Sequence, residues 1–210
     1  MIEVGPGRGA LTDYLVRRHE RVVAIEFDEE LARSLEGRHP NLTVVHQDVL
    51  QADLAAWGPA VLAGNLPYYI TSPILERIFR FRSVLQEAVI LIQREVADRV
   101  VAGPGSRDYG YLSVLTQVHT EPRYVMTVKP GAFNPPPKVD SAVIHLRIKQ
   151  DAAGLDPFLG FVSMCFRHKR KTLRNNLSSQ YAIDGQPEAG LRAEQLSIAE
   201  LLGLFERLRF

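Results

Sequence analysis

Short runs of apolar and β-branched residues alternate with helical patterns along the first half of the chain. Each run has the length of a strand, and the apolar residues between the runs recur at the three- and four-residue spacing of an amphipathic helix. This alternation is typical of a parallel sheet covered by helices, because parallel strands need long crossover connections. The expected strands are Ile2–Val4, Val22–Glu26, Thr43–His46, Ala60–Gly64 and Ala88–Gln93.

Two later segments predict an antiparallel pair at one edge of the sheet. Residues 124–129 and 142–148 alternate apolar and polar side chains, and a proline-rich stretch at 133–138 joins them. The expected fold class is therefore α/β, with a Rossmann-like, doubly wound and mostly parallel seven-stranded sheet that ends in an antiparallel hairpin.

The length of the chain allows one sizeable domain and a small appendage. We expect residues 1–150 to form the domain that contains the sheet, 151–157 a linker, and 158–210 a small all-α C-terminal domain. The formal net charge of +1 gives no overall attraction for nucleic acid, so any basic surface must be local.

Cysteine content and hydropathy indicate where the protein resides. Cys165 is the single cysteine of the sequence, which excludes an internal disulfide and fits a reducing cytoplasm. No apolar run has the length needed to span a bilayer, and no secretory signal is visible. We therefore expect a cytoplasmic protein with no membrane partner.

The first expected strand begins at residue 2, with nothing in front of it. A central strand that leads into a glycine-rich turn normally follows several more residues and a covering helix. We therefore expect the chain to be truncated at its N-terminus or wrongly assigned at its start. An in-frame stop codon directly before Met1 would contradict this expectation.

A glycine-rich turn follows the first expected strand. Gly5, Gly7 and Gly9 have the spacing Gly-x-Gly-x-Gly, and glycine permits a positive φ and a close approach of the backbone to a ligand. The spacing differs from the Gly-x-Gly-x-x-Gly of the dinucleotide fingerprint. Taken alone, the turn is a weak signal of a cofactor site.

Acidic residues end or follow the next two expected strands, on the same edge of the sheet. Glu26 is placed to accept hydrogen bonds from both ribose hydroxyls of a nucleoside, and Asp48 can accept one from an adenine amino group. For either residue alone, a solvated carboxylate or a helix cap is the simpler interpretation. In series with the glycine turn, the two acids indicate S-adenosylmethionine or a dinucleotide.

The sequence Asn65-Leu66-Pro67-Tyr68 follows the fourth expected strand and favours methyl transfer. The exocyclic amine of a nucleobase is a poor nucleophile because its lone pair is delocalised into the ring. The Asn65 side-chain oxygen and a neighbouring main-chain carbonyl can accept both amino hydrogens and free the lone pair, and Pro67 has no competing N–H. Tyr68 can lie flat against the base. We take these four residues as candidate catalytic residues; an ordinary proline-containing turn is the alternative.

Phe133 completes the candidate catalytic set. It stands at the head of the Pro135-Pro136-Pro137 turn, on the edge of the sheet where the cofactor is expected. An aromatic residue on such a rigid turn makes a stacking platform for an extruded base. A hydrophobic plug beneath the loop is the alternative.

Basic residues gather in the expected C-terminal domain. Arg167, Arg170, Lys171 and Arg174 are spaced at i, i+3, i+4 and i+7, which predicts one face of a helix, and residues 158–177 contain no acidic residue. Such a stripe suits the phosphates of RNA, although a solubilising face is the commoner use of a charge run.

Arg107, in the loop that follows Gly103-Pro104-Gly105, is a further candidate for RNA binding. The histidines show no metal-ligand spacing, so we expect no metal site.

The segments above, with Gln47-Asp48 and the stretch Phe133–Ser141, resemble the rRNA adenine N6,N6-dimethyltransferases, and the resemblance covers nearly the whole chain. The bacterial small-subunit branch is the most similar. The resemblance implies transfer of methyl groups from S-adenosylmethionine to the N6 amines of adjacent adenines in 16S rRNA of the immature small subunit, during ribosome biogenesis. We expect the protein to be a monomer.

The resemblance assigns roles to single residues. It implies that Gly5, Glu26, Asp48 and Asn65 contact the cofactor, with Gly7 of the same turn, and that Asn65 also serves the target base. Tyr68 and Phe133 would stack on the flipped adenine. One feature departs from the family pattern: a Gly-Gln-Asn-Phe-Leu segment ahead of the first strand is absent from this sequence.

Three other functions remain open from the residues. The chain could be an rRNA-binding assembly factor with impaired catalysis, or a methyltransferase of large-subunit rRNA of the erythromycin-resistance type. A nicotinamide-dependent oxidoreductase would explain the glycine turn and Glu26, but not Asn65-Leu66-Pro67-Tyr68.

Overall fold

The computed structural model describes residues 1–150 and 154–209, so the expected linker at 151–157 lies partly outside the described residues. The chain divides into two compact units. The first contains residues 1–97 and 120–150, and the second contains 98–119 and the described part of 151–210. A segment from the middle of the chain thus belongs to the C-terminal unit. The expected domain boundaries stay a prediction.

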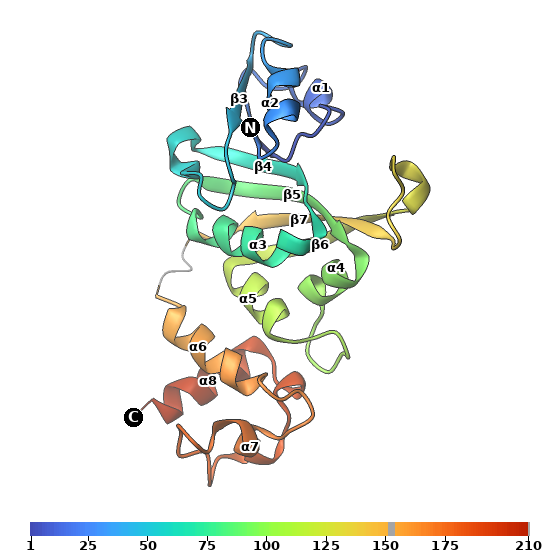
Figure 1. Ribbon diagram of the computed structural model, residues 1–210. Coiled ribbons are helices and arrows are strands. Elements are labelled where there is room, and N and C mark those ends of the chain that lie inside the picture. The colour runs from blue at the N-terminus through green and yellow to red at the C-terminus, as the bar shows by residue number, and fades with distance from the viewer. Residues whose placement is uncertain (151–153, 210) are drawn as a thin grey trace. The chain divides into compact units, whose positions relative to one another are not determined.

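One seven-stranded sheet, of order β3-β2-β1-β4-β5-β7-β6, forms the centre of the first unit (Figure 1). The first five strands are parallel, and β7 pairs antiparallel with both β5 and β6. The α/β class and the antiparallel edge hairpin are therefore confirmed. The strands are β1 (Ile2–Val4), β2 (Val22–Glu26), β3 (Leu42–His46), β4 (Ala60–Asn65), β5 (Leu85–Gln93), β6 (Thr120–Val128) and β7 (Ser141–Ile148).

The strand order reverses beside β1, which pairs with β2 on one side and with β4 on the other. In open α/β sheets, ligands bind outside the carboxyl ends of the strands at such a reversal. Every residue of β1 and β2 is buried, as expected for central parallel strands. Gly64 allows β4 to lie close to β1, since a Cβ at this position would be 2.6 Å from the carbonyl oxygen of Val4.

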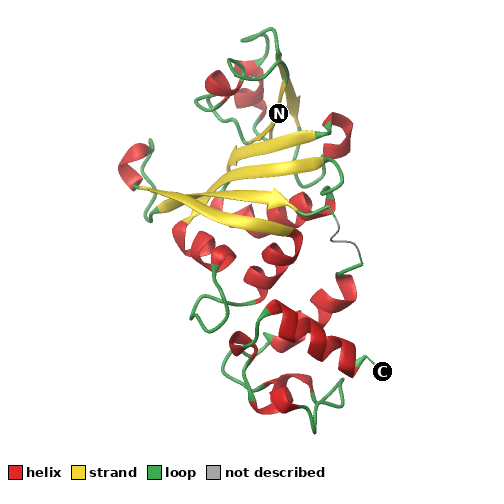
Figure 2. Cartoon of the chain, turned by 180° about the vertical axis from the view of Figure 1, so that it is seen from behind, coloured by secondary structure: helices red, strands yellow, loops and turns green. Residues whose placement is uncertain are grey.

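Helix α3 (Thr71–Arg80) covers one face of the sheet with Ile74, Leu75 and Ile78, all buried. Figure 2 shows the other face, with the strands toward the viewer. A short 3₁₀ turn, Tyr68–Ile70, runs directly into α3, which has no side-chain cap at its N-terminus. The other helices of this unit are α1 (Thr12–Leu15), α2 (Glu29–Leu35) and the start of α4 (Arg94–Val101).

Strand β6 is the outer strand at one edge of the sheet. Pro122 lies within it, and its register with β7 shifts between Tyr124 and Met126. Proline lacks a ladder donor, and an irregular register bends the strand. The exposed side chains of Val125 and Met126 lie at this irregularity.

The second unit has its own hydrophobic core. It contains α5 (Tyr111–His119), α6 (Asp156–Cys165), α7 (Leu173–Leu177) and α8 (Ile198–Leu208), together with short 3₁₀ turns. Phe161 lies at the centre of this core, with ring centroids 5.3 Å from Tyr181 and 5.4 Å from Phe205. No helix among the described residues is both long and apolar enough to cross a membrane.

Candidate active site

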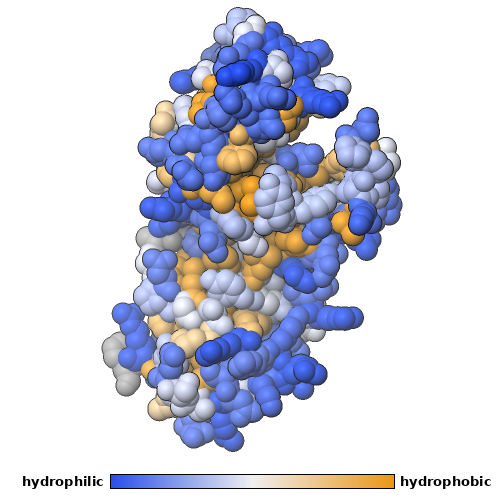
Figure 3. Space-filling model, in the orientation of Figure 1, coloured by the Kyte–Doolittle hydropathy of each residue, from blue (hydrophilic) through white to orange (hydrophobic). Residues whose placement is uncertain are grey.

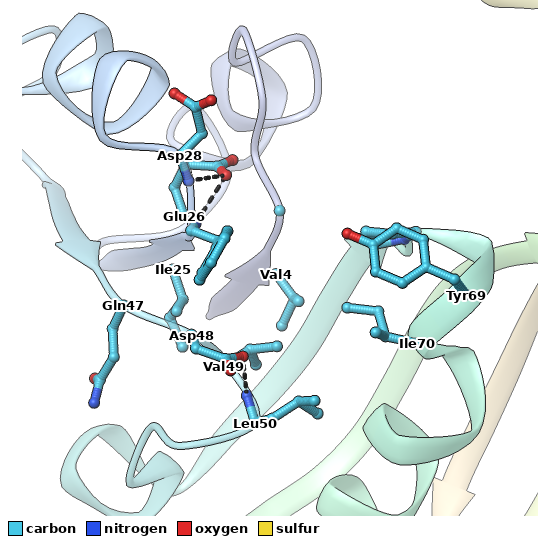
Figure 4. Close-up of a pocket in the computed structure, with 13 residues that line it drawn as sticks. Val4, Ile25, Glu26, Asp28, Gln47, Asp48, Val49, Leu50, Tyr69 and Ile70 are labelled. Carbon is cyan, nitrogen blue, oxygen red and sulfur yellow. Dashed lines mark hydrogen bonds between the residues drawn. The ribbon is translucent and has the colours of Figure 1, made fainter.

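A cavity of about 450 Å³ lies at the carboxyl ends of β1, β2 and β3 (Figure 4). This volume falls within the range of about 300–1,000 Å³ that is usual for small-molecule pockets. Both acidic and apolar residues line the cavity. Its lining is Val4, Gly5, Ile25, Glu26, Phe27, Asp28, Gln47, Asp48, Val49, Leu50, Pro67, Tyr69 and Ile70.

Glu26 holds the glycine-rich turn in place. Its Oε2 accepts a hydrogen bond from the backbone N–H of Gly7 at 2.9 Å, and its Oε1 accepts from Phe27 and Asp28 at 2.8 and 3.0 Å. Gly5 and Gly7 have φ values of 66° and 57°, in the left-handed region that favours glycine. The carboxylate therefore fixes the turn and still offers a lone pair to a ligand. Its predicted contact with a ribose stays a prediction.

Asp48 lies on the opposite side of the cavity from the glycine turn (Figure 4). Its Oδ1 accepts a hydrogen bond from the backbone N–H of Leu50 at 2.8 Å, which fixes the loop after β3. Asp28 in turn caps helix α2 by accepting from the Leu31 N–H at 3.0 Å. The structure thus brings Gly5, Glu26 and Asp48 to one cavity, whereas Gly7 and Asn65 do not line it. The binding of a cofactor by these residues stays a prediction.

Two aromatic residues of this cavity were not among the residues predicted from the sequence. Phe27 and Tyr69 line the cavity although their exposed fractions are 74% and 85%. A bulky aromatic residue directly after a strand-end acid, and a second tyrosine after Tyr68, were the available signals. Large apolar side chains left in water at a cavity are ready to bury surface against a ligand.

A second cavity, of about 340 Å³, lies beside the first and shares Pro67 with it. It brings together all five candidate catalytic residues, because its lining is Asn65, Leu66, Pro67, Tyr68, Phe133, Pro135, Pro136 and Pro137. The Asn65–Tyr68 turn and the proline-rich loop, which are distant in the sequence, therefore form two walls of one site. Their catalytic roles stay predictions.

The residues of the turn differ in burial. Leu66 is buried and anchors the turn, and its N–H donates to the Leu91 carbonyl at 3.0 Å. Asn65 is exposed and Tyr68 is half-buried, with its hydroxyl 2.8 Å from Oγ of Ser141. Phe133 is also half-buried. The polar and aromatic groups expected to meet a base are thus the accessible ones.

Glu3 is a buried acid on the strand that leads into the glycine turn. Burial raises the pKa of Glu3, the nearby Thr12 hydroxyl lowers it in part, and the carboxylates of Asp13 and Glu26 raise it further. Its Oε2 has no hydrogen-bond partner among the described residues. Glu3 therefore favours its neutral form more than an exposed glutamate does.

The basic residues of the C-terminal unit do not share a helical face, which corrects the sequence prediction. Helix α6 ends at Cys165 and α7 begins at Leu173, so Arg167, Arg170 and Lys171 lie in the loop between them. Residues 166–171 form turns and bends between the two helices. The Thr172 side chain then accepts a hydrogen bond from the Asn175 N–H and caps the start of α7. Arg174, on α7, pairs with Asp184 at 2.9 Å.

The loop at 166–172 nevertheless presents its charges to solvent. Arg167, Lys169, Arg170 and Lys171 are all exposed, and the part of Figure 3 that holds the C-terminal helices is largely hydrophilic. Lys169 Nζ donates to the Arg107 carbonyl at 2.5 Å, which brings Arg107 to the same loop. The structure therefore groups four of the five predicted RNA-binding residues, and their binding stays a prediction. No group of metal-ligating side chains occurs in the described part of the chain.

Comparison with known proteins agrees with the geometry. The sequence pattern of ribosomal RNA adenine dimethylase matches residues 1–208. The ribosomal RNA small subunit methyltransferase A of Acidobacterium capsulatum is 46% identical over 228 residues, which cover 99% of this chain and 81% of that protein. The protein of the same name from Thermotoga maritima is 39% identical over 212 residues, with 100% and 75% covered.

Solved structures give the same result. A dimethyladenosine transferase from Plasmodium falciparum superposes with a TM-score of 0.85 at 25% identity, covering 97% of this chain and 87% of that one. The 23S rRNA methyltransferase ErmE superposes with a TM-score of 0.73 at 31% identity, covering 100% and 90%. The resemblance seen in the sequence is confirmed. This chain belongs to the ribosomal RNA adenine dimethylase family.

Proposed function

We propose that this protein transfers methyl groups from S-adenosylmethionine to the N6 amines of adjacent adenines in 16S rRNA, giving N6,N6-dimethyladenine during ribosome biogenesis. The observation that carries the proposal is the pair of cavities that meet at Pro67. One suits a nucleoside cofactor, and the other suits a planar base. A transfer between two ligands needs such neighbouring sites.

The residues of the first cavity fit the cofactor. Glu26 keeps a lone pair for ribose hydroxyls, and Asp48 presents a carboxylate on the far side of the cavity, where an adenine amino group would lie. Val4, Ile25 and Ile70 supply apolar surface for the purine. When bound, S-adenosylmethionine supplies an electrophilic methyl group on a sulfonium.

The residues of the second cavity would prepare the acceptor. Tyr68 and Phe133 would hold the flipped adenine by stacking, which is sequence-tolerant because every base has an aromatic face. The Asn65 side-chain oxygen and a backbone carbonyl of the turn would accept the two amino hydrogens. Alignment of the amine is then the main contribution of the protein, and positioning of this kind can supply roughly 7–11 kcal/mol.

The partner is proposed to be the rRNA of the immature small ribosomal subunit, since the relatives from Acidobacterium capsulatum and Thermotoga maritima carry the name of small-subunit methyltransferases. The exposed basic loop at 166–172 supports phosphate contacts. We propose that the protein acts as a monomer in the cytoplasm, where that RNA is assembled, without a metal ion.

Methylation of isolated small subunits tests the proposal. Small and large subunits from cells that lack this activity are incubated with labelled S-adenosylmethionine, and the modified adenines are mapped. We expect dimethylated adenines in small subunits. Binding of subunits without transfer would instead support an assembly factor, and cofactor titration against a nicotinamide dinucleotide tests the oxidoreductase.

One variant tests the role of the turn. Asn65→Ala should lower turnover far more than cofactor affinity, because Asn65 lines the base cavity and not the cofactor cavity. Normal methylation by this variant would contradict the proposed role.

A second candidate is methylation of large-subunit rRNA, which the likeness to ErmE favours. The relative from Acidobacterium capsulatum is more similar, at 46% against 31% identity. Transfer to large subunits in the same assay would support the second candidate.

A further inference from the structure

The first residue of β7 and the residue before it contact both walls of the base cavity. Ser141 Oγ lies 2.8 Å from the hydroxyl of Tyr68, which belongs to one wall. Asp140 Oδ2 accepts a hydrogen bond from Lys129 Nζ at 2.8 Å, at the start of the loop that carries Phe133 in the other wall. Two consecutive residues thus join segments that lie far apart in the sequence.

Asp140 closes the loop of residues 129–140 at its base. Lys129 directly follows β6, Asp140 directly precedes β7, and the last residue of β6 is the register partner of Ser141. The ion pair therefore joins the two ends of the loop beside the last rung of the ladder. The hydrogen bond from Lys129 lowers the pKa of Asp140, so its carboxylate is charged under ordinary conditions.

The same residue ties the loop to the neighbouring strand β5. The Arg94 N–H, directly after β5, donates to the Asp140 carbonyl at 3.0 Å, and Arg94 Nη1 lies 3.4 Å from Asp140 Oδ2. The exposed fractions of the Arg94, Lys129 and Asp140 side chains are 53%, 74% and 20%. Exposed ion pairs contribute little to the stability of a fold. The contacts of Asp140 with Lys129 and Arg94 can instead fix the position of the loop of residues 129–140.

Ser141 fixes the wall of the base cavity that contains Tyr68, through the hydroxyl oxygen of that tyrosine. Its side chain is fully buried and held by β7, whereas Tyr68 is half-buried in a turn. A hydrogen bond at the tip of a tyrosine restrains rotation of its ring. Because the ring face is the surface that a base would meet, the bond sets the orientation of that face.

We propose that Asp140 and Ser141 are positioning residues that hold Phe133 and Tyr68 in the geometry one flipped adenine requires. The inference rests on the proposed function. Both residues act through others, and neither lines the base cavity or the cofactor cavity. Their loss displaces the walls while the cofactor cavity, which neither of them lines, stays intact. Displacement of a reacting group by about 1 Å can lower a rate by roughly 10²-fold.

A double-mutant cycle tests the contact between Ser141 and Tyr68. Ser141→Ala and Tyr68→Phe should each lower kcat on small subunits by about tenfold, with unchanged affinity for S-adenosylmethionine. The double variant should lose no more than either single variant, because both remove the same hydrogen bond. A loss equal to the product of the two single losses would overturn the role of Ser141.

Asp140→Asn tests the closure of the loop. The substitution removes a negative charge at the base of the loop that lines the base cavity, so KM for subunits should stay equal or fall, while kcat should fall by about 10- to 100-fold. Lys129→Met removes the ion pair between Lys129 and Asp140 by a change at an exposed residue, and it should also lower kcat. This second variant tests the closure of the loop even if Asp140→Asn folds poorly. The ratio of dimethylated to monomethylated adenine, compared at equal total transfer, should fall in both.

The matched control is Glu121→Gln. Glu121 pairs with Arg147 at 3.9 Å at the other end of the same hairpin, and its substitution makes the same change of charge. It should leave kcat and the product ratio unchanged. Equal kcat for Asp140→Asn and Glu121→Gln would overturn the proposal. Absence of methylation by the unmodified protein would instead count against the proposed function.

Discussion

Replacement of Glu26 by glutamine separates two roles of this carboxylate. In the structure it accepts three backbone hydrogen bonds, one on Oε2 from Gly7 and two on Oε1 from Phe27 and Asp28. A glutamine oxygen can keep the pair from Phe27 and Asp28, but its amide group then faces the Gly7 N–H, donor against donor. The turn loses the bond that holds its second glycine.

The magnitude follows from the lost bond. A hydrogen bond to a charged acceptor contributes about 1.5–3 kcal/mol, and its loss leaves a backbone donor unsatisfied. Because an amide is cheaper to bury than a carboxylate, we expect the lower part of that range, about 1.5–2 kcal/mol. Affinity for S-adenosylmethionine should fall by at least about tenfold, which corresponds to roughly 1.4 kcal/mol.

Urea unfolding without cofactor is the decisive assay. If Glu26 only contacted the ribose, the free energy of unfolding without cofactor would not change, whereas a residue that holds the turn lowers it. Glu29→Gln is the control, because Glu29 forms an exposed i,i+4 pair with Arg33 and its loss should cost no more than about 0.5 kcal/mol. Equal stability of the two variants would refute the argument.

Three further predictions concern other parts of the chain. Replacing Arg170 and Lys171 by alanine should weaken rRNA binding and reduce the salt slope of the affinity by about 1 to 2, measured by titration at several salt concentrations; an unchanged slope would contradict phosphate contacts. Glu3→Gln should raise the free energy of unfolding at neutral pH, because the raised pKa means that ionisation of Glu3 costs stability as the pH rises above the ordinary glutamate pKa. The difference from the unmodified protein should vanish in acid, and a constant difference would refute this. Gly64→Ala should destabilise the fold by about 1–3 kcal/mol in urea unfolding, since its Cβ would meet the Val4 carbonyl oxygen at 2.6 Å, and a neutral result would show that β4 can move away from β1.

The sequence predicted the sheet well because its strands are buried or alternating and so carry a strong hydrophobic signal. The five parallel strands were predicted to within three residues at each end, and the edge hairpin was also predicted. Glu26 and Asp48 could be placed because the ends of parallel strands meet at one edge of a sheet. The resemblance to the family then supplied the cofactor and the reaction.

The sequence failed where tertiary contacts decide the local structure. Charges at helical spacing predicted a helix through Arg170, but the chain turns after Cys165 and α7 restarts at the Thr172 cap. The contacts of Glu26 with the Gly7 N–H and of Tyr68 with Ser141 could not be predicted either, since they join segments distant in the sequence. Phe27 and Tyr69 were missed because exposure of an aromatic side chain cannot be read from spacing.

The outer strand β6 affects the tendency of the protein to aggregate. A nine-residue strand at the rim of a sheet offers free backbone groups on which another chain can pair and start an aggregate. Pro122 removes one of those donors, and the shift between Tyr124 and Met126 bends the rest out of line. These two features disfavour growth of the sheet by strand addition at this rim, even though Val125 and Met126 leave apolar surface there.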